Sequence, residues 1–265
     1  KNALMSLINE IHYTNNYLEI GSPIIDSETK FSSKTYKDYC KIRNYDIMKI
    51  EGENDLIIKS INCPSALTYY RLKQRKETDL PLKIFECGVL HRDIAHNNLD
   101  GLFNLSEFTQ DDAHLFVTPK QVVDELNKVL DMVENFYTKV GLSYSVELAT
   151  RPCKFLGERK TWTEAEEILR SVLTERFGEG NFGISKGTGS YFGPKINILV
   201  KDAKLNSWTT GTIQLDMQLP KKYNLTYISD KTSEEIPVVI HRTIAGSIER
   251  LIALIIENTA GKFPF

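Results

Sequence analysis

The feature that most constrains the fold is a pair of long β-like stretches separated by a polar segment. Between Leu80 and Val117, the stretches LPLKIFECGVLHR and FNLSEFTQDDAHLFV flank the polar segment DIAHNNLDG. Strands joined by a loop pair antiparallel, whereas parallel strands need a long crossover connection. The sequence therefore predicts a long antiparallel hairpin with a polar loop in this part of the chain.

Apolar residues at helical spacing precede and follow this hairpin. Residues 1–14 have a helical pattern, and a short strand around Tyr17–Ile20 follows and ends at Ser22-Pro23. Pro119 fits a helix start, and the stripe after it consists of Val122, Val123, Leu126, Val129, Leu130, Val133, Phe136 and Tyr137. A second helix carries its apolar residues at similar spacing: Trp162, Ala165, Ile168, Leu169, Val172 and Leu173. We interpret both stripes as faces that pack on a core.

The last third of the chain returns to strand patterns. Strands are expected at Lys195–Val200 and Thr209–Leu219, and a strand at Pro237–His241 leads into an apolar helix at Ala245–Glu257. Strands joined by hairpins, with helices segregated between them, indicate an α+β domain: a central antiparallel β-sheet flanked by helices. No repeat or linker divides the chain, so residues 1–265 are interpreted as one domain.

Composition indicates the compartment of the protein and the kinds of partner that it can bind. The chain has 265 residues, of which 41% are hydrophobic and 26% are charged, and no apolar run approaches the roughly 20 residues that cross a bilayer. The N-terminal residues lack the layout of a signal peptide. The four cysteines are widely spaced without a CxxC pair, so we expect reduced thiols and a cytoplasmic location. The net charge of −2 shows no overall positive charge of the kind that binds nucleic acid, so any contact with RNA must come from a local basic patch.

One short motif suggests a protein kinase. The segment HRDIAHNN, residues 91–98, fits the kinase catalytic loop, and GTGS, residues 187–190, resembles part of a kinase glycine-rich loop. In kinases the glycine-rich loop precedes the catalytic loop, and a D-F-G and an A-P-E segment follow it. The order is reversed here and both later segments are absent, which excludes a kinase.

Three segments in order resemble the motifs of class II aminoacyl-tRNA synthetases. The helix, strand and proline of residues 1–23 resemble motif 1, FECGVLHR and FTQDDAH within residues 82–117 resemble motif 2, and GSIER within residues 237–258 resembles motif 3. The blocks NCP, DLPL, QDDAH, FGPKI and IHR narrow the resemblance to the threonyl-tRNA synthetase family. The resemblance implies activation of L-threonine with ATP to threonyl-adenylate, followed by transfer to tRNA(Thr).

The same resemblance implies a zinc ion bound by Cys63, His114 and His241, with Asp112 facing the amino group of threonine. One thiolate and two imidazoles leave zinc an open position for a ligand. A site that must bind a hydroxyl rejects valine, whereas serine differs from threonine only by a methyl group, worth about 1–3 kcal/mol. Without the resemblance, Cys63 and His114 would be interpreted as buried or incidental residues, and Asp112 as a solvated charge at a strand end.

For the ATP side, the resemblance implies Arg92 on the α-phosphate and Arg250 on the γ-phosphate, with magnesium assisting. Arginine suits both places because its planar fork engages phosphate oxygens in pairs. It also implies a homodimer formed through the motif 1 region. Further residues match positions that line the adenylate and amino-acid pocket: Gln110, Phe192, Lys195, Gln214 and Ser247.

The chain departs from the family pattern mainly around ATP. Ile94 replaces the motif 2 glutamate, Asn104 stands in a normally arginine-rich segment, Glu107 adds a negative charge, and Phe192 replaces a tyrosine. We expect weaker ATP binding from these changes, because a like charge beside the pyrophosphate is repulsive. Two alternatives therefore stay open: a paralog that activates threonine or a relative for another acceptor, and a zinc-dependent amino-acid-binding module with weakened catalysis. The editing and anticodon-binding domains that the resemblance implies are not expected within this chain.

Overall fold

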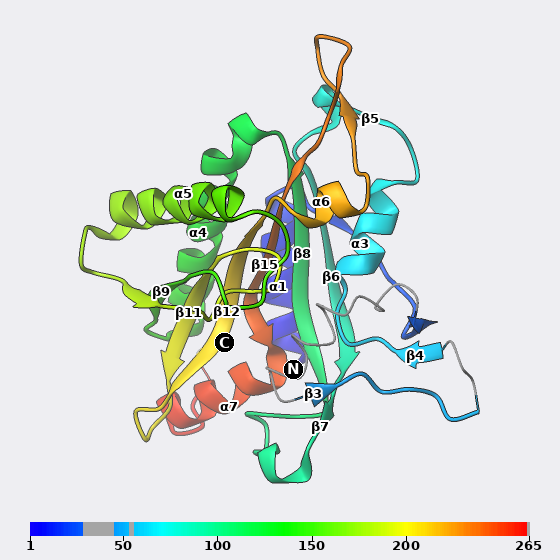
Figure 1. The fold of residues 1–265 in the computed structure, drawn as a ribbon. Coiled ribbons are helices and arrows are strands. Elements are labelled where there is room, and N and C mark those ends of the chain that lie inside the picture. The colour runs from blue at the N-terminus through cyan, green and yellow to red at the C-terminus, as the bar shows by residue number, and fades with distance from the viewer. Residues whose placement is uncertain (29–44, 53–55, 264–265) are drawn as a thin grey trace.

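The fold is built on one eight-stranded sheet (Figure 1), seen in a computed structural model that describes residues 1–28, 45–52 and 56–263. Cys40 lies outside the described residues. In spatial order the strands are β1 (Leu18–Glu19), β6 (Leu82–His91), β8 (Glu107–Val117), β15 (Val238–Ser247), β12 (Ser207–Asp216), β11 (Lys195–Lys201), β9 (Ser145–Ala149) and β10 (Gly183–Ser185).

The predicted hairpin is the β6–β8 pair, the second and third strands in this order, and it is antiparallel over ten residue pairs from Leu82–Phe116 to His91–Glu107. All neighbours from β6 to β9 pair antiparallel, as predicted. The two edges differ, because β1 pairs parallel with β6 and β10 pairs parallel with β9. Helix α5 (Arg159–Phe177) connects β9 to β10, and a helical crossover of this kind returns the chain in the parallel direction.

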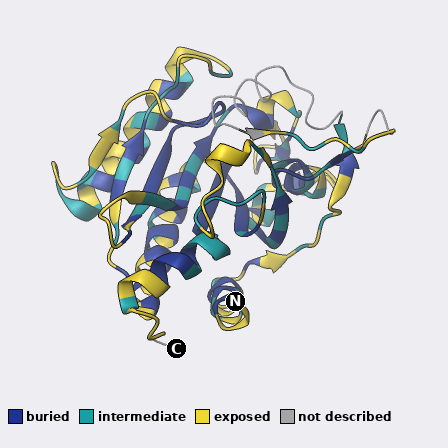
Figure 2. Cartoon of the chain, turned by 90° about the horizontal axis from the view of Figure 1, so that it is seen from below, coloured by how far each residue is buried: buried dark blue, intermediate teal, exposed yellow. Residues whose placement is uncertain are grey.

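Helices cover one face of the sheet and form the larger core with it. These are α1 (Asn2–Thr14), α4 (Val122–Val140), α5 and α7 (Ile248–Thr259), whose apolar sides pack with the sheet in one buried cluster. The helices at residues 1–14, after Pro119 and around Trp162 are therefore confirmed. Val123 is the exception in the α4 stripe, because it is 43% exposed and points away from the core. Figure 2 shows buried residues along the central strands and exposed ones on the outer helix surfaces.

The opposite face of the sheet carries shorter elements and a second core. Strand alternation separates the two cores, since Leu115 belongs to the helix-side cluster and Phe116 to the other. The elements on this side and at its margins are α3 (Cys63–Tyr70), α6 (Leu219–Lys222), the 3-10 turns η2 (Glu77–Asp79), η3 (His96–Asn98) and η4 (Pro119–Gln121), and the strands β2 (Ile25–Ser27), β3 (Tyr45–Asp46), β4 (Leu56–Ile58), β5 (Arg75–Lys76), β7 (Asp93–Ile94), β13 (Tyr227–Ile228) and β14 (Glu234–Glu235).

Two predicted boundaries are wrong, and a side chain explains each. Strand β15 continues to Ser247 and α7 begins at Ile248, not at Ala245, because the Asp111 carboxylate accepts the backbone N–H groups of residues 244 and 245. Strand β12 ends at Asp216, and its carboxylate accepts the N–H groups of residues 218 and 219 to start α6. Hydrogen bonds from side chains to the backbone cannot be predicted from the spacing of apolar residues, so both boundaries were missed.

The helices of the described residues include none with the length and apolar character that a bilayer span requires.

Candidate active site

A cavity of about 490 Å³ opens on the sheet face opposite the helices. Its floor consists of alternate residues of β8, β15, β12 and β11, which the two-residue period of a strand directs to the same side. Every predicted site residue except His114 lines it: Cys63, Arg92, Gln110, Asp112, Phe192, Lys195, Gln214, His241, Ser247 and Arg250. His114 is buried directly beside it, so the structure brings together all the residues that the resemblance implied.

Three potential metal ligands meet at one end of the cavity. Cys63 opens α3, whereas His114 and His241 lie opposite each other in the β8–β15 register. One ligand atom from each of the three residues lies within 4.8 Å of the others. The two imidazole rings are 4.8 Å apart between centroids and nearly perpendicular, so both can direct a nitrogen toward one point.

The hydrogen bonds of the two histidines leave nitrogen atoms available for a metal. His241 Nε2 lies 2.8 Å from the Asp216 carboxylate, which can only accept, so Nε2 carries the proton and donates it. Among the described residues, no group bonds His241 Nδ1 or His114 Nε2, although both atoms are buried. A buried nitrogen without a partner is costly, and a metal ion would satisfy both.

The protonation states also fit a metal. Burial lowers the pKa of His114 well below its ordinary value, so the ring is neutral, which is the form that binds metals. Burial raises the pKa of the Cys63 thiol well above its ordinary value, and the carboxylates of Asp112 and Asp216 add to the rise. Only a nearby cation would make the thiolate favourable there. One sulfur and two imidazole nitrogens form a donor set that suits zinc.

The Asp216 carboxylate is expected to tune this metal site. Asp216→Asn keeps the shape of the side chain but removes the charge that orients and polarises His241, so zinc affinity should fall about 10–100-fold. Zinc affinity can be measured by competition with a chromophoric chelator. The control is Asp202→Asn, because Asp202 also accepts backbone N–H groups of a turn but contacts neither histidine. An unchanged zinc affinity in Asp216→Asn would show that this contact is only structural.

Asp112 lies between the metal end and the rest of the cavity. Burial raises its pKa to about 7, and the neighbouring Asp111 carboxylate contributes in the same direction. A carboxyl group with such a pKa gains charge readily when a cation approaches, since the opposite charge offsets the cost of burial. The ammonium group of an amino acid is a cation of suitable size.

Two arginines provide positive charge at the other end of the cavity. Arg250 donates from Nε to the Phe103 carbonyl at 2.7 Å and from Nη1 to the Thr209 carbonyl at 2.9 Å, which orients its guanidinium plane. The Arg92 guanidinium lies over the Phe108 ring, 4.7 Å from its centroid. Burial, followed by the charge of Arg92, lowers the pKa of Arg250 to about 10, so it stays charged at neutral pH. An anion bound between the two would relieve this repulsion.

The structure corrects one expectation about the ATP side. Ile94 and Asn104 line the cavity as expected, but Glu107 does not. Phe108 and Gln110 face the cavity, so the alternation of β8 directs Glu107 to the opposite side, where its carboxylate lies 2.9 Å from His91 Nε2. The Glu107 carboxylate therefore adds no negative charge to the lining of the cavity.

Sequence reasoning missed other residues that shape the site. Asp216 polarises His241, and Phe103 stacks on Trp208 with ring centroids 4.7 Å apart, next to Arg250. Asp216 was detectable, since it lies two residues beyond Gln214 and a strand repeats its face at that spacing. The contact between Phe103 and Trp208 could not be predicted from a local pattern, because the two residues lie far apart in the sequence.

Comparison with known proteins identifies the family. The model of the tRNA synthetase class II core domain (G, H, P, S and T) matches residues 45–259, which is most of the chain. The chain therefore belongs to the class II aminoacyl-tRNA synthetases.

Within that class, the chain is similar to threonine–tRNA ligases. It is 39% identical over 263 residues to the one from Desulfosudis oleivorans and 40% identical over 264 residues to the one from Clostridioides difficile. These alignments include 99% and 100% of this chain but 41% of each relative, so the chain spans about two fifths of their length.

Solved structures agree with this placement. A structure of threonyl-tRNA synthetase from Cryptosporidium parvum, described as its RNA binding domain, superposes with a TM-score of 0.89 at 35% identity over 98% of this chain and 65% of that one. Seryl-tRNA synthetase from Pyrococcus horikoshii has a TM-score of 0.72 at 14% identity over 97% of this chain and 50% of that one, a likeness of fold alone.

Proposed function

We propose that this chain is the catalytic core of a threonine–tRNA ligase, which activates L-threonine with ATP and transfers it to tRNA(Thr). The observation that carries the proposal is the composition of the cavity. A Cys63–His114–His241 cluster lies at one end and the Arg92–Arg250 pair lines the same cavity. An amino acid and the phosphates of ATP must meet in one site for adenylate formation, and this cavity offers a place for each.

The arginines would stabilise the charge that develops during activation. The carboxylate of threonine attacks the α-phosphorus of ATP, a mixed anhydride forms, and magnesium pyrophosphate leaves. Catalysis of phosphoryl-type transfer is largely positioning and electrostatic stabilisation, and donors already fixed in place need no reorganisation. Arg250 fits this requirement because two backbone carbonyls orient its guanidinium group.

The opposite end would select threonine. A zinc ion bound by Cys63, His114 and His241 would supply a Lewis-acid position for the amino group and the hydroxyl of the substrate. Asp112 would pair with the amino group, and Gln110, Lys195 and Gln214 would line the space between the amino acid and the adenylate. Valine lacks the hydroxyl and would leave this position unmatched, whereas serine lacks only a methyl group.

Transfer to tRNA(Thr) and assembly as a homodimer through residues 1–23 are part of the same proposal, on the basis of the family. A second candidate function, an amino-acid-binding module with weakened activation, is favoured by Ile94 and Asn104. Both line the cavity, and neither is charged.

Amino-acid-dependent exchange of pyrophosphate into ATP tests the proposal. With zinc and magnesium present, threonine should support exchange, serine should be poorer by about 10–200-fold in kcat/KM, and valine should support none that is measurable. Absence of exchange with threonine would contradict the proposal. Threonine binding without ATP binding would favour the second candidate, and adenylate formation without charging of tRNA(Thr) by the full-length protein would indicate another acceptor.

A further inference from the structure

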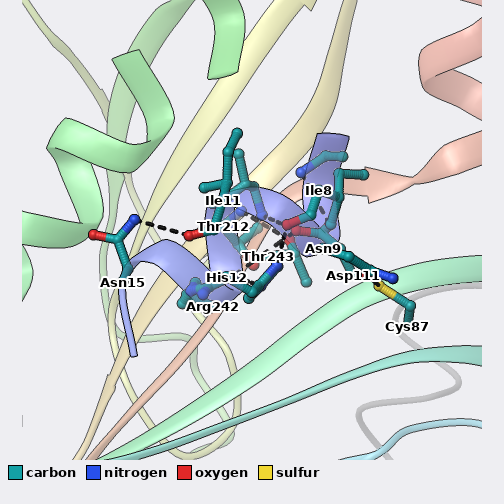
Figure 3. Close-up of polar contacts among 12 residues, drawn as sticks. Ile8, Asn9, Ile11, His12, Asn15, Cys87, Asp111, Thr212, Arg242 and Thr243 are labelled. Atoms are coloured by element: carbon teal, nitrogen blue, oxygen red, sulfur yellow. Dashed lines mark hydrogen bonds and ion pairs between the residues drawn. The ribbon is translucent and has the colours of Figure 1, made fainter. Parts of the chain in front are cut away.

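A buried polar cluster lies on the helix side of the sheet, which is the face opposite the cavity. Figure 3 shows the polar contacts of its members. The cluster joins His12 of α1, Asp111 of β8 and Arg242 of β15, and all three side chains are fully buried. None of them lines the cavity, because strand alternation directs Asp111 and Arg242 away from it while their neighbours Asp112 and His241 face it. Buried charges of this kind are costly and need a specific reason to persist.

His12 gives this cluster a defined hydrogen-bond direction. Its Nδ1 lies 2.6 Å from the Ile8 carbonyl, which can only accept, and its Nε2 lies 2.8 Å from Arg242 Nη1, which can only donate. The ring is therefore neutral, with the proton on Nδ1. Burial, and then the charge of Arg242, lowers the pKa of His12 to about 2, in agreement with this assignment. Arg242 is thereby oriented, with Nη1 also 3.9 Å from the Asp111 carboxylate.

Asp111 binds the backbone where β15 leaves the sheet ladder. The register between β15 and β8 is broken between Thr243 and Ser247, so the amides between them lose their strand partners. The Asp111 carboxylate accepts the Ile244 N–H at 2.8 Å and the Ala245 N–H at 2.9 Å. Its charge thus replaces the missing strand across this bulge.

The bulge is also held from the side of β12, the other neighbour of β15. The Tyr137 hydroxyl lies 2.9 Å from the Ile244 carbonyl and 2.6 Å from Thr210 Oγ1. Gly246 has a φ of +60°, and a Cβ added there would lie 2.0 Å from the Thr210 carbonyl oxygen. The backbone path into α7 is therefore determined by contacts on both sides.

This path determines where the ATP-facing residues lie. Ser247 follows the bulge directly, and its hydroxyl accepts the Arg250 N–H at 3.2 Å, capping α7. Arg250 occupies the first turn of that helix and lines the cavity.

We propose that Asp111 is a positioning residue for ATP: by binding the amides of residues 244 and 245, it sets the place of Ser247 and Arg250. The inference rests on the proposed function, since it takes ATP as the ligand of Arg250. Asp111 touches no substrate. It acts through the backbone, and the His12–Arg242 pair keeps its charge compensated.

The test is the variant Asp111→Asn, assayed by calorimetry with magnesium–ATP and separately with threonine. Its amide would present a donor where a second acceptor is needed, shifting the bulge, and ATP affinity should fall about tenfold or more, because small displacements of positioned groups have large effects. The zinc content should be unchanged, since Cys63, His114 and His241 do not depend on the bulge. Threonine affinity should change far less than ATP affinity, because Asp111 reaches Asp112 only through its charge. Equal losses of ATP affinity and threonine affinity, or no loss of ATP affinity, would overturn the inference.

Two further variants guard against simple destabilisation. Tyr137→Phe is nearly isosteric and removes only the hydroxyl on the other side of the bulge, so it should weaken ATP binding in the same selective way if Asp111→Asn does not fold. Glu125→Gln is the control, because Glu125 is an equally buried carboxylate that pairs with Lys83 and Lys128 far from the bulge. It should leave the affinities for ATP and threonine unchanged.

Amide hydrogen exchange of residues 238–250 gives a readout that is independent of turnover. The segment should exchange faster in Asp111→Asn and Tyr137→Phe than in the wild type or in Glu125→Gln, and unchanged exchange would overturn the inference. If the wild type binds ATP but shows no threonine-dependent exchange of pyrophosphate, the proposed function fails, and the ATP affinities of the variants still decide the role of Asp111. If the wild type binds no ATP, both fail.

Discussion

Arg250→Gln is expected to lower threonine-dependent pyrophosphate exchange by about 10²–10³-fold, the usual effect of removing one preorganised donor from a developing charge. Arg250 is charged at neutral pH, lies in the cavity and is oriented by two backbone carbonyls. Glutamine keeps the polar character of the side chain but loses the charge and the planar fork. The loss should appear in ATP-dependent steps only, with zinc content and threonine binding unchanged.

Arg176→Gln is the matched control for this prediction. Arg176 is also an arginine with two partners, but these are Asp131 and Glu134 at the outer surface of the helix layer. Its exchange activity should equal that of the wild type. If Arg250→Gln retained activity within about threefold of the wild type, an essential electrostatic role for this arginine would be contradicted.

Cys63→Ala is expected to release the metal. It removes one of three protein ligands, so zinc affinity should fall by more than the roughly 100-fold that loss of an orienting partner can cause. Threonine binding should fall with it, because the substrate would lose the ion that we propose distinguishes its hydroxyl from the methyl of valine. Metal content after dialysis and threonine calorimetry measure both effects.

Cys87→Ala is the control for Cys63→Ala. Cys87 is a partly buried thiol on the helix side of the sheet, where its Sγ lies 3.5 Å from Asn9 Oδ1. This variant should retain zinc and bind threonine normally. Retention of zinc by Cys63→Ala would show that the ligand assignment is wrong.

Local patterns in the sequence predicted most of the fold. The β6–β8 hairpin and the helices after Pro119 and around Trp162 followed from alternation and from helical spacing of apolar residues. The short edge strands were harder to predict, because β10 owes its parallel partner to the α5 crossover and not to its own three residues. The end of β15 was missed because Asp111, distant in sequence, binds its amides.

The site required a different kind of information. Cys63, His114 and His241 lie far apart in the sequence, so no local spacing relates them. From the sequence, only the family resemblance grouped them. In the structure, the pairing of β8 with β15 places His114 opposite His241, and Cys63 lies close to both. For Glu107 the family motif was misleading, because the position of this residue in the motif suggested that its charge lies beside the phosphates of ATP. The two-residue period of β8, counted from Gln110, would have directed it to the other face.

The most direct test of a threonine site built on a metal uses Co²⁺ in place of zinc. Cobalt bound by Cys63, His114 and His241 should give thiolate charge-transfer and visible absorption bands. Threonine should shift the visible bands on entering the coordination sphere, and valine should leave the hydroxyl position unmatched and give a different spectrum. A cobalt spectrum that does not change with threonine, or changes identically with valine, would contradict recognition of threonine through the metal.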